Sequence, residues 1–414
     1  MSRSFLQLLP VEEALARLDR FRPVSRRERV GLTAACGRVL AGAVASSEPV
    51  PAFARSLMDG FAVRSGDVAS ARETAPVFLR RIGAVEMGRP AGLTIRSSQA
   101  AAVPTGAMLP EGADAVVMLE HSRELAGGQV EILRASAAGE HVLAAGEDLL
   151  PGASLCAAGQ RLEPLDVGAL AACGAVEVEV FCRPRVAVLS TGDELVDAAA
   201  RPGPGQVRDT NALVLAAQVI RAGGEALLCG RVPDEPGALI RTTRQAREQA
   251  DLVLLSGGSS VGVRDHTAAV LAELSGVELL IAGVAISPGK PTLLADLDGV
   301  AAFGMPGHPV SSFVVFHVLV APLVERLAGL CGRGRRPTVR GRLADNAPAA
   351  PGRETWLRVR LERETDGEQR VVPLAGSSAV YTSLLRSDGL LRIPAGQEGW
   401  AAGEEVDVEL LRWS

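Results

Sequence analysis

The sequence predicts a multidomain α/β plus β fold, with a doubly wound α/β domain that follows β-rich segments and precedes a small β-barrel. Its 414 residues exceed the size at which a single hydrophobic core stops growing, so about two to four domains are expected. Strand-like and helix-like segments alternate between residues 183 and 332, which is typical of a mostly parallel sheet covered on both faces. Before and after this region, short apolar runs alternate with turn residues, which is typical of β modules.

The N-terminal part is predicted to change from helix to strand. About the first forty residues are expected to be helical, because Val11, Ala14 and Leu18 recur at helical spacing after Pro10. From 41 to 139 the apolar runs are short, which predicts a β-rich module. A further helix is expected before the central domain. The strands and the helix predicted here are Ala115–Leu119, Gln129–Leu133 and Pro164–Cys173.

The central region is predicted to alternate between strands and helices. Asp209 and Thr210 can cap a helix whose Leu213, Ala217 and Ile220 share one face. Asp234 and Pro236 open a second helix that continues to about Ala250. The other predicted elements are strands at Arg185–Leu189, Asp251–Leu255, Thr292–Leu297 and Val300–Phe303, a helix at Asp265–Leu274, and a long apolar helix from Pro309.

From Pro337 to Ser414, successive residues alternate with the period of two that is typical of strands, and no helical spacing occurs. Trp356, Arg358 and Arg360 alternate with Leu357, Val359 and Leu361, and Val406–Leu411 repeats the period. This pattern favours a small antiparallel barrel or sandwich. The preceding boundary, Cys331–Arg336, is rich in glycine and arginine, and it fits either a solvated linker or an anion-binding run.

Composition restricts the class of protein. Hydrophobic residues make up 47% and charged residues 22% of the chain, a balance typical of globular domains. The net charge of -5 gives no general attraction for nucleic acid, so an anionic ligand must be held by local groups. Glu12 and Glu13 stand where a signal peptide needs its apolar run, so a cytoplasmic location is expected.

Two further features exclude common alternatives. The six cysteines include no C-x-x-C pair, so we expect buried reduced thiols and neither a zinc site nor a disulfide framework. The uncharged segment Phe303–Val324 is long enough to cross a bilayer, but Pro306, Pro309 and Pro322 interrupt it. We therefore expect a buried helix that begins near Pro309, and no membrane partner.

Polar loops follow three of the predicted strands. These loops are Ser190–Glu194, Ser256–Gly262 and Met305–Pro309. In an open parallel sheet, ligands bind outside the carboxyl ends of the strands. The three loops are therefore expected to converge on one crevice.

The loop chemistry suits phosphate and a divalent cation. The glycines of Ser256–Gly262 allow either an anion cradle of backbone N–H groups or a plain tight turn. The carboxylates Asp193, Glu194, Asp209 and Asp265 are hard oxygen ligands suited to Mg²⁺ shared with phosphate oxygens. Asp209 and Asp265 equally suit helix caps.

Lys290 is the single lysine among 43 basic residues. It lies in Ser287–Pro291, where the prolines on both sides restrict its backbone. A compact ammonium kept where every other cation is arginine indicates an anion site. The alternative is a surface lysine in a stiff turn.

These segments resemble the MoeA family and the related gephyrin E domain over nearly the whole chain. Ser56–Val63 is similar to the family motif S-x-M-D-G-[YF]-A, and Pro104–Val117 is similar to T-G-A-x-x-P-x-G-A-D-A-V-V. The remaining matching segments follow in family order: Gly146–Asp148, Ser190–Leu195, Asp209–Asn211, Ser256–Asp265, Pro288–Pro291 and Gly304–Pro309.

The resemblance implies a homodimer of elongated subunits, with the site between the α/β domain of one subunit and the lid of the other. It implies a molybdopterin-binding, MogA-like α/β domain. The division it implies is 1–45 for the N-terminal helical part of the elongated domain, 46–139 for an inserted β-rich lid, 140–182 for the second part of the elongated domain, 183–332 for the α/β domain, and 333–414 for the C-terminal barrel.

The resemblance implies a molybdopterin molybdenumtransferase, which inserts molybdate into adenylyl-molybdopterin with Mg²⁺ and releases AMP. Catalytic roles are implied for Asp59, Thr105, Glu194, Asp265 and Lys290, with Asp265 and Glu194 also holding Mg²⁺. Substrate-binding roles are implied for Asp148, Thr191, Gly192, Asp193, Asp209, Asn211, Ser256, Gly257, Gly258, Ser260, Gly262, Ser287, Pro288, Gly289, Pro306, Gly307, His308 and Ser311.

The chain departs from the family where many members have two further lysines, here Ser287 and Gly283. This leaves the choice between molybdate and tungstate open. Two other functions are weighed: a MogA-type molybdopterin adenylyltransferase, and a non-catalytic dimeric scaffold. Expected protein partners are the adenylyltransferase of the preceding step and molybdoenzyme chaperones.

Overall fold

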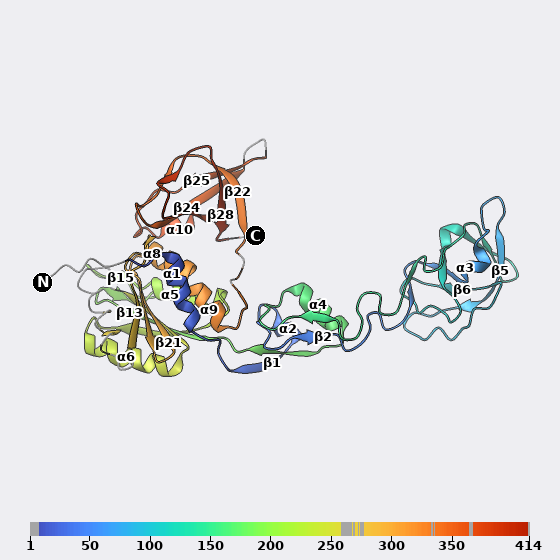
Figure 1. The fold of residues 1–414 in the computed structure, drawn as a ribbon, viewed down its shortest axis with the longest axis horizontal. Coiled ribbons are helices and arrows are strands. Elements are labelled where there is room, and N and C mark those ends of the chain that lie inside the picture. Colours follow the sequence, from blue (N-terminus) through green and yellow to red (C-terminus); the bar gives the residue numbers. More distant parts are fainter. Residues whose placement is uncertain are drawn as a thin grey trace.

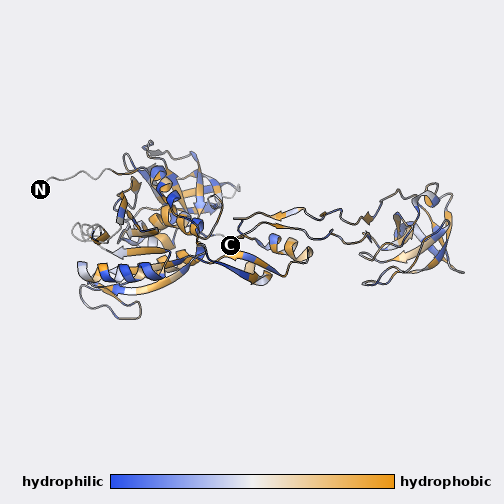
Figure 2. Ribbon diagram, turned by 60° about the horizontal axis from the view of Figure 1, so that its bottom comes forward, coloured by the Kyte–Doolittle hydropathy of each residue, from blue (hydrophilic) through white to orange (hydrophobic). Residues whose placement is uncertain are grey.

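The computed structural model describes residues 8–257, 267, 270, 271, 273, 277–332, 334, 336–363 and 367–412. The chain forms an elongated molecule in which an α/β domain and a β-barrel occupy one end and a small β domain occupies the other (Figure 1). A narrow arm joins the two ends, and both views of the ribbon show it (Figures 1 and 2). The multidomain α/β plus β fold is confirmed, whereas the domain boundaries stay a prediction.

The N-terminal segment contributes to two parts of the molecule. Helix α1 (Val11–Arg17) and a short 3-10 turn (Leu18–Arg20) pack into the core of the α/β domain. The chain then enters the arm, where β1 (Arg27–Gly31) pairs antiparallel with β12 (Glu177–Phe181). The predicted helix over forty residues is therefore wrong beyond Arg20, because β12, a partner distant in sequence, pairs with the following segment.

The rest of the arm is made from two separated stretches of chain. Helix α4 begins at Pro164 with a capping box between Glu163 and Asp166, which confirms the predicted helix there. Leu162 and Leu170 are buried in the small core of the arm. Its further elements are α2 (Leu32–Ala35), β2 (Val44–Ala45), β3 (Arg55–Ser56), β10 (Val142–Leu143), β11 (Ser154–Cys156) and α4 (Pro164–Ala172).

The distal β domain, called the lid below, contains one six-stranded sheet. Both predicted strands in this region are present, and Phe61, Leu79 and Ile132 are buried in its core. In sheet order the strands are β7 (Ala115–Met118), β4 (Gly60–Val63), β6 (Gln99–Val103), β5 (Val77–Ala84), β9 (Gln129–Ile132) and β8 (Ser122–Leu125); α3 (Ser65–Val68) and a 3-10 turn (Leu119–His121) complete the lid.

The α/β domain contains a six-stranded sheet with helices on both faces. Helix α1, α5 and the helix that begins at Pro309 cover one face, and α6 covers the other. The first four strands in sheet order are parallel to one another, and β20 pairs antiparallel with both β21 and β18. The elements are β16 (Glu225–Val232), β13 (Arg185–Thr191), β17 (Leu252–Gly257), β21 (Val300–Met305), β20 (Leu293–Leu297), β18 (Val277–Ala282), α5 (Asn211–Arg221), α6 (Pro236–Gln249), and the small pair β14 (Leu195–Val196) and β15 (Val207–Arg208).

The buried face of α5 differs from the predicted one. Leu215 and Val219 are buried, whereas Leu213 and Ile220 are 50% and 58% exposed. The helix is apolar on most of its circumference, so periodicity alone could not identify the face that packs on the sheet. Two exposed apolar side chains remain on the outer surface of this helix.

The apolar segment after β21 forms a buried helix, as predicted. It consists of α8 (Pro309–Val315), a π-helical turn (Phe316–Val320) and α9 (Ala321–Leu327). Among the described residues it is the one helix long and apolar enough to cross a membrane, and 78% of it is buried inside the protein. It therefore forms part of the core of the α/β domain.

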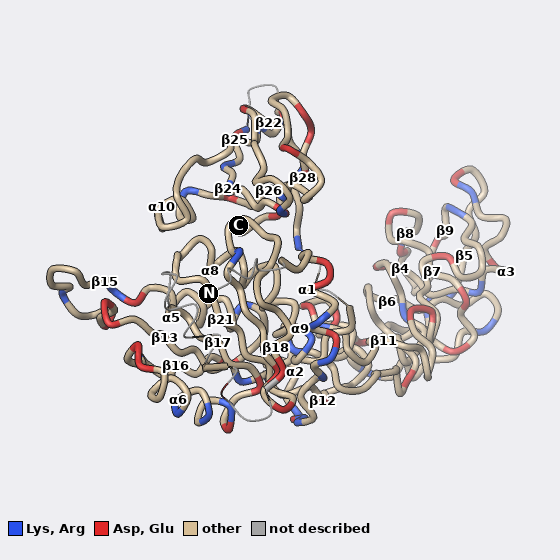
Figure 3. The backbone as a smooth tube through the Cα atoms, turned by 60° about the vertical axis from the view of Figure 1, so that its left-hand side comes forward, with Lys and Arg blue, Asp and Glu red and all other residues tan. Residues whose placement is uncertain are grey.

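The C-terminal domain is a closed five-stranded barrel that sits beside α8 (Figures 1 and 3). It closes because β24 pairs with both β25 and β26. The barrel is mixed, because β22 and β25 run parallel. Its elements are β22 (Thr338–Leu343), β24 (Glu354–Arg363), β25 (Gln369–Pro373), β26 (Gly389–Ile393) and β28 (Glu405–Leu410), with β23 (Ala347–Pro348), β27 (Gly399–Trp400) and α10 (Thr382–Leu385) outside the ring.

Tertiary packing decides the burial of Arg358, and the expectation of buried cysteines is wrong at three positions. Arg358 is only 7% exposed and donates from Nη2 to the carbonyl of Gly376 at 2.8 Å. Burial lowers the pKa of this guanidinium. The six cysteines are free thiols, but Cys36, Cys229 and Cys331 are exposed rather than buried.

Candidate functional site

The predicted loops meet at one edge of the α/β sheet. Strands β13, β17 and β21 are adjacent and parallel, so their carboxyl ends lie side by side. The register pairs Thr191 with Gly257 and Ser256 with Met305. The three loops therefore start from the same rim, as the order of elements predicted.

Close backbone packing holds this rim together. Gly257 has a φ of +151°, and a Cβ there would lie 2.0 Å from the carbonyl oxygen of Thr191. Only glycine fits this position. Asn211, at the start of α5, donates from Nδ2 to Ser256 Oγ at 3.3 Å and to the carbonyl of Gly307 at 2.8 Å. The amide side chain thus ties the second and third loops.

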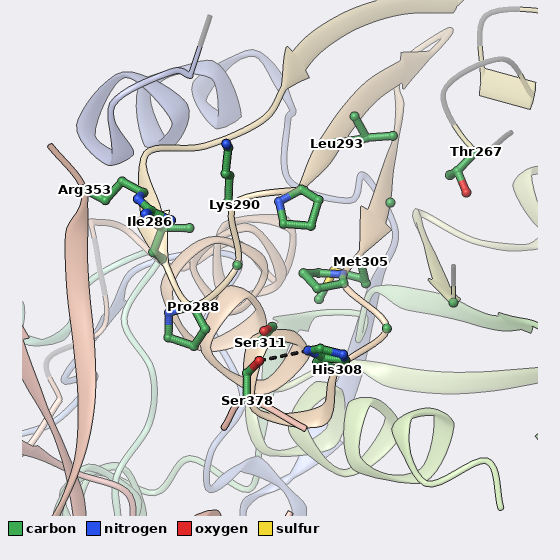
Figure 4. Close-up of a pocket in the computed structure, with 16 residues that line it drawn as sticks. Thr267, Ile286, Pro288, Lys290, Leu293, Met305, His308, Ser311, Arg353 and Ser378 are labelled. Carbon is green, nitrogen blue, oxygen red and sulfur yellow. Dashed lines mark hydrogen bonds between the residues drawn. The ribbon is translucent and has the colours of Figure 1, made fainter. Parts of the chain in front are cut away.

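A cavity of about 290 Å³ opens at this rim (Figure 4). It joins the second loop, the third loop and the turn that carries the single lysine. Eight of the residues assigned by resemblance line it: Gly257, Pro288, Gly289, Lys290, Pro306, Gly307, His308 and Ser311. Asn211 donates to Gly307 of this wall and to Ser256, and Ser287 directly precedes Pro288.

Strand pairing between two domains positions Lys290. The short strand β19 (Ile286–Ser287) leaves the α/β domain and pairs parallel with β24 of the barrel. Gly289 then turns with a φ of +127° against Val315, whose Cγ2 would be 2.4 Å from an added Cβ. Thr292 Oγ1 donates to the carbonyl of Gly289 at 2.6 Å. The turn is therefore fixed, while the Lys290 side chain is exposed toward the cavity (Figure 4).

The barrel contributes two residues that the sequence did not indicate. Arg353 directly precedes β24, and the pairing of Ile286 with Glu354 places it at the cavity near Lys290 (Figure 4). Ser378 Oγ lies 2.9 Å from His308 Nδ1, and its carbonyl accepts from Val310 N–H at 3.1 Å. In the sequence, Arg353 shows only the pattern of a strand start, so no local signal could have identified it.

The charge of the cavity favours an anion. Lys290 and Arg353 line it, and no carboxylate occurs among its described lining residues. No described carboxylate forms an ion pair with either cation. Two cations in such a lining suit a tetrahedral oxyanion or a phosphate group.

Three of the four predicted carboxylates, Asp193, Glu194 and Asp209, lie beyond the end of β13 and do not line this cavity. Asp209 is buried and caps α5, accepting from Ala212 N–H at 3.1 Å. Thr191 Oγ1 donates to Asp234 at 3.2 Å, and Asp193 accepts from the Asp234 N–H at 3.3 Å. Glu194 is exposed, with its carboxylate folded back over Gly192.

The other residues of the predicted phosphate and metal site follow Gly257 in the sequence. Asp265, Gly258, Ser260 and Gly262 lie outside the described residues. Within the described part of the chain, no group of three or more His, Cys, Asp and Glu side chains is arranged to hold a metal ion.

The remaining predicted residues lie elsewhere in the subunit. Asp59 and Thr105 are together in the lid, where Thr105 N–H donates to Asp59 Oδ1 at 2.8 Å, and both are exposed. Asp148 is exposed in the arm. The lid and the α/β domain lie at opposite ends of the elongated molecule (Figure 1). A single subunit therefore does not bring these residues to the cavity.

Three family models match consecutive parts of the chain. Residues 9–174 match the MoeA N-terminal region (domain I and II), residues 187–326 match a probable molybdopterin binding domain, and residues 340–411 match the MoeA C-terminal region (domain IV). The first and third models cover regions outside the α/β domain that a smaller pterin-binding protein would not need.

Similar proteins are related over almost their full length. A molybdopterin molybdenumtransferase from a Nostoc species is 36% identical over 92% of this chain and 88% of its own length. One from Mycobacterium tuberculosis is 35% identical over 97% and 98%. A crystal structure of a molybdopterin biosynthesis MoeA protein from Pyrococcus horikoshii is 32% identical, with a TM-score of 0.85 over 98% of this chain and 100% of that one.

Proposed function

The chain belongs to the MoeA family of molybdopterin molybdenumtransferases, and from this premise we propose that the Lys290 cavity binds molybdate beside the phosphate groups of adenylyl-molybdopterin. The protein is a transferase of molybdenum cofactor biosynthesis. The observation that carries the proposed binding mode is the pair of cations, Lys290 and Arg353, in a lining without a described carboxylate. Molybdate and phosphate carry the complementary charge.

The proposed reaction needs positioning and charge stabilisation. Water attacks the phosphoanhydride, which releases AMP and leaves a phosphate on the pterin, and a molybdate oxygen leaves as water with the two thiol protons when the metal bonds to the two sulfur atoms of the pterin. Negative charge develops on phosphate oxygens during this step, so cations fixed beforehand lower its barrier. Lys290 and Arg353 supply such charges from two domains, and the rim at Gly257 supplies close backbone approach. No covalent intermediate on the protein is required.

We also propose that the reaction requires Mg²⁺. Glu194 and Asp265 are the residues proposed to hold the ion together with phosphate oxygens of the substrate. A bound Mg²⁺ neutralises part of the charge on those oxygens. The support is the chemistry of Glu194, an exposed carboxylate next to Asp193 in the loop after β13.

The proposed active form is a homodimer in which the lid of one subunit covers the cavity of the other. Asp59 and Thr105 form an exposed hydrogen-bonded pair that lies far from the cavity of its own chain. Exposed apolar side chains at Leu57, Met58, Leu213 and Ile220 fit burial by a second copy. A cytoplasmic location, and contacts with the preceding adenylyltransferase and with molybdoenzyme chaperones, stay predictions.

The test is incubation of the purified protein with adenylyl-molybdopterin, molybdate and Mg²⁺, following both AMP release and metal insertion. We expect both products, and a second series with tungstate measures the choice of oxyanion. Absence of both products would refute the proposed reaction. A second incubation with molybdopterin and ATP distinguishes the two alternatives, because an adenylyltransferase would consume ATP and accumulate adenylyl-molybdopterin, and a scaffold would do neither.

Substitution of Asp265 tests whether this residue holds Mg²⁺. We expect Asp265→Ala to abolish AMP release while the protein stays folded. Restoration of activity by raised Mg²⁺ concentration in Asp265→Asn would show that the carboxylate acts through the ion. Unchanged kinetics of Asp265→Ala would remove this residue from the mechanism.

A further inference from the structure

A buried arginine of the barrel has no acidic partner among the described residues. Arg358 lies within β24 and is only 7% exposed. Burial alone lowers the pKa of its guanidinium, and no described carboxylate forms an ion pair with it. By contrast, Arg38, the other arginine that is buried in the described part of the chain, is paired with Glu28. Burial of a cation without a counter-charge costs stability, so packing alone does not account for Arg358.

The guanidinium of Arg358 holds the segment that follows β25. Its Nη2 donates to the carbonyl of Gly376 at 2.8 Å, and its Nε has no acceptor among the described residues. The backbone carbonyl of Arg358 accepts from Leu374 N–H at 2.9 Å. Gly376 has a φ of +144°, a conformation that favours glycine. The start of this segment is therefore fixed on the barrel by one residue.

The same segment continues into the wall of the Lys290 cavity. Ser378 lines the cavity, and its Oγ lies 2.9 Å from His308 Nδ1 (Figure 4). Its carbonyl accepts from Val310 N–H at 3.1 Å. Val310 belongs to the first turn of α8, where an N–H group has no acceptor within the helix. Ser378 thus joins the barrel to the start of α8 at the cavity.

We infer that Arg358 is a positioning residue of the proposed oxyanion site, because it holds the segment that places the Ser378 hydroxyl at the Lys290 cavity. This inference rests on the proposed binding of molybdate. An oxyanion only accepts hydrogen bonds, so the hydroxyl donates to it and His308 Nδ1 donates to the hydroxyl oxygen. Arg358 itself does not line the cavity and acts through Ser378.

Substitution of Arg358 tests this role without removing a residue of the cavity lining. Arg358→Met keeps an unbranched side chain and removes the charge and the donors. We expect the molybdate concentration for half-maximal metal insertion to rise about tenfold, the effect of one misplaced hydrogen bond, while kcat changes less than about twofold. Arg358→Lys keeps the charge and a donor and should recover part of the loss.

A double variant shows whether Arg358 acts through Ser378. Ser378→Ala removes the hydroxyl and should itself raise the molybdate requirement. Arg358→Met combined with Ser378→Ala should raise it no further than Ser378→Ala alone, because the two changes remove the same interaction. Losses that multiply in the double variant would overturn the inference.

Stability distinguishes positioning from a purely structural role. In urea unfolding, Arg358→Met should be no less stable than the unmodified protein, because it removes a buried unpaired cation. The matched control is Arg360→Met, an exposed arginine two residues further on the same face of β24, which should change neither stability nor the molybdate requirement. A loss of stability together with a lowered kcat in Arg358→Met would show a structural role and contradict the inference.

Hydrogen exchange at the Val310 amide gives a measurement that needs no substrate. The Ser378 carbonyl accepts from this N–H, so displacement of the segment should expose it. We expect exchange at least about tenfold faster in Arg358→Met and unchanged in Arg360→Met. Unchanged exchange in Arg358→Met overturns the inference whether or not the protein transfers molybdenum. Absence of metal insertion by the unmodified protein would instead refute the proposed reaction on which the inference rests.

Discussion

Single residues decide the charge of the Lys290 cavity. Ser287 and Gly283 stand where many related proteins have lysines, yet the cavity still has two cations because Arg353 reaches it from the barrel. The guanidinium can donate two parallel hydrogen bonds to an oxyanion, whereas the ammonium of Lys290 acts as a compact charge. Substitutions of Lys290 and of Arg353 are therefore expected to have separate effects on oxyanion binding.

Arg353→Ala is expected to raise the molybdate concentration for half-maximal metal insertion about ten- to a hundredfold, the effect of a lost charge-assisted hydrogen bond. Lys290→Arg should also weaken molybdate use, because the longer planar group does not fit the position of the ammonium. Steady-state kinetics over a range of molybdate concentrations measures both. Arg386→Ala, on the exposed surface of the same barrel, is the control and should match the unmodified protein.

Gly257 is a second position where a single residue matters, because only glycine allows the backbone to approach Thr191 so closely at the rim. Gly257→Ala places a Cβ 2.0 Å from a carbonyl oxygen at a φ of +151°, so we expect destabilisation of more than about 2 kcal/mol. Urea unfolding measures the free energy. Gly42→Ala, which meets no atom within 4 Å, should change it by less than about 1 kcal/mol; similar losses at the two positions would contradict the close approach at the rim.

At the scale of elements, several contacts join the barrel to the α/β domain, and two of them bear on function and stability. The pairing of β19 with β24 places Arg353 beside the lysine turn. On the other side, His317 of the π-helical turn is 8% exposed and bonds Glu409 of β28 at 2.8 Å. Burial holds the pKa of His317 below its ordinary value, and the charges of Arg336 and Arg221 act in the same direction, against the raising effect of Glu409.

The lowered pKa of His317 predicts acid sensitivity. The unfolded chain takes up a proton near the ordinary histidine pKa of 6.5, whereas the folded chain takes it up only at lower pH. Stability is therefore retained above about pH 6.5 and falls as the pH drops below it, by at most about 1.4 kcal/mol per pH unit. His317→Gln should reduce this slope in urea titrations between pH 7.5 and 5.5. His121→Gln in the lid should not, and an equal slope in all three proteins would refute the assignment.

At the scale of the whole molecule, the elongated shape separates residues that the proposed reaction unites. Asp59 and Thr105 lie at the end of the chain opposite the Lys290 cavity (Figure 1). In the proposed two-fold dimer, the lid of each subunit covers the cavity of the other subunit. Each complete site would then take its residues from two chains.

Mixed dimers test this arrangement. Asp59→Ala and Lys290→Ala proteins should each be inactive alone. After unfolding and refolding together in equal amounts, about a quarter of the unmodified activity is expected, because half the dimers are mixed and each of these has one intact site. Failure to recover activity in confirmed mixed dimers would show that each site is built within one subunit.

The sequence by itself determined the order of the parts, the polar loops after β13, β17 and β21, and the single lysine near them, because strand periodicity and turn chemistry are local properties. Only the tertiary structure decided that α5 buries Leu215 rather than Leu213, that Arg358 is buried, and that Arg353 and Ser378 complete the cavity. These outcomes depend on which distant surfaces pack together, as in the pairing of Ile286 with Glu354. Such contacts leave no periodic signal in the segments that make them.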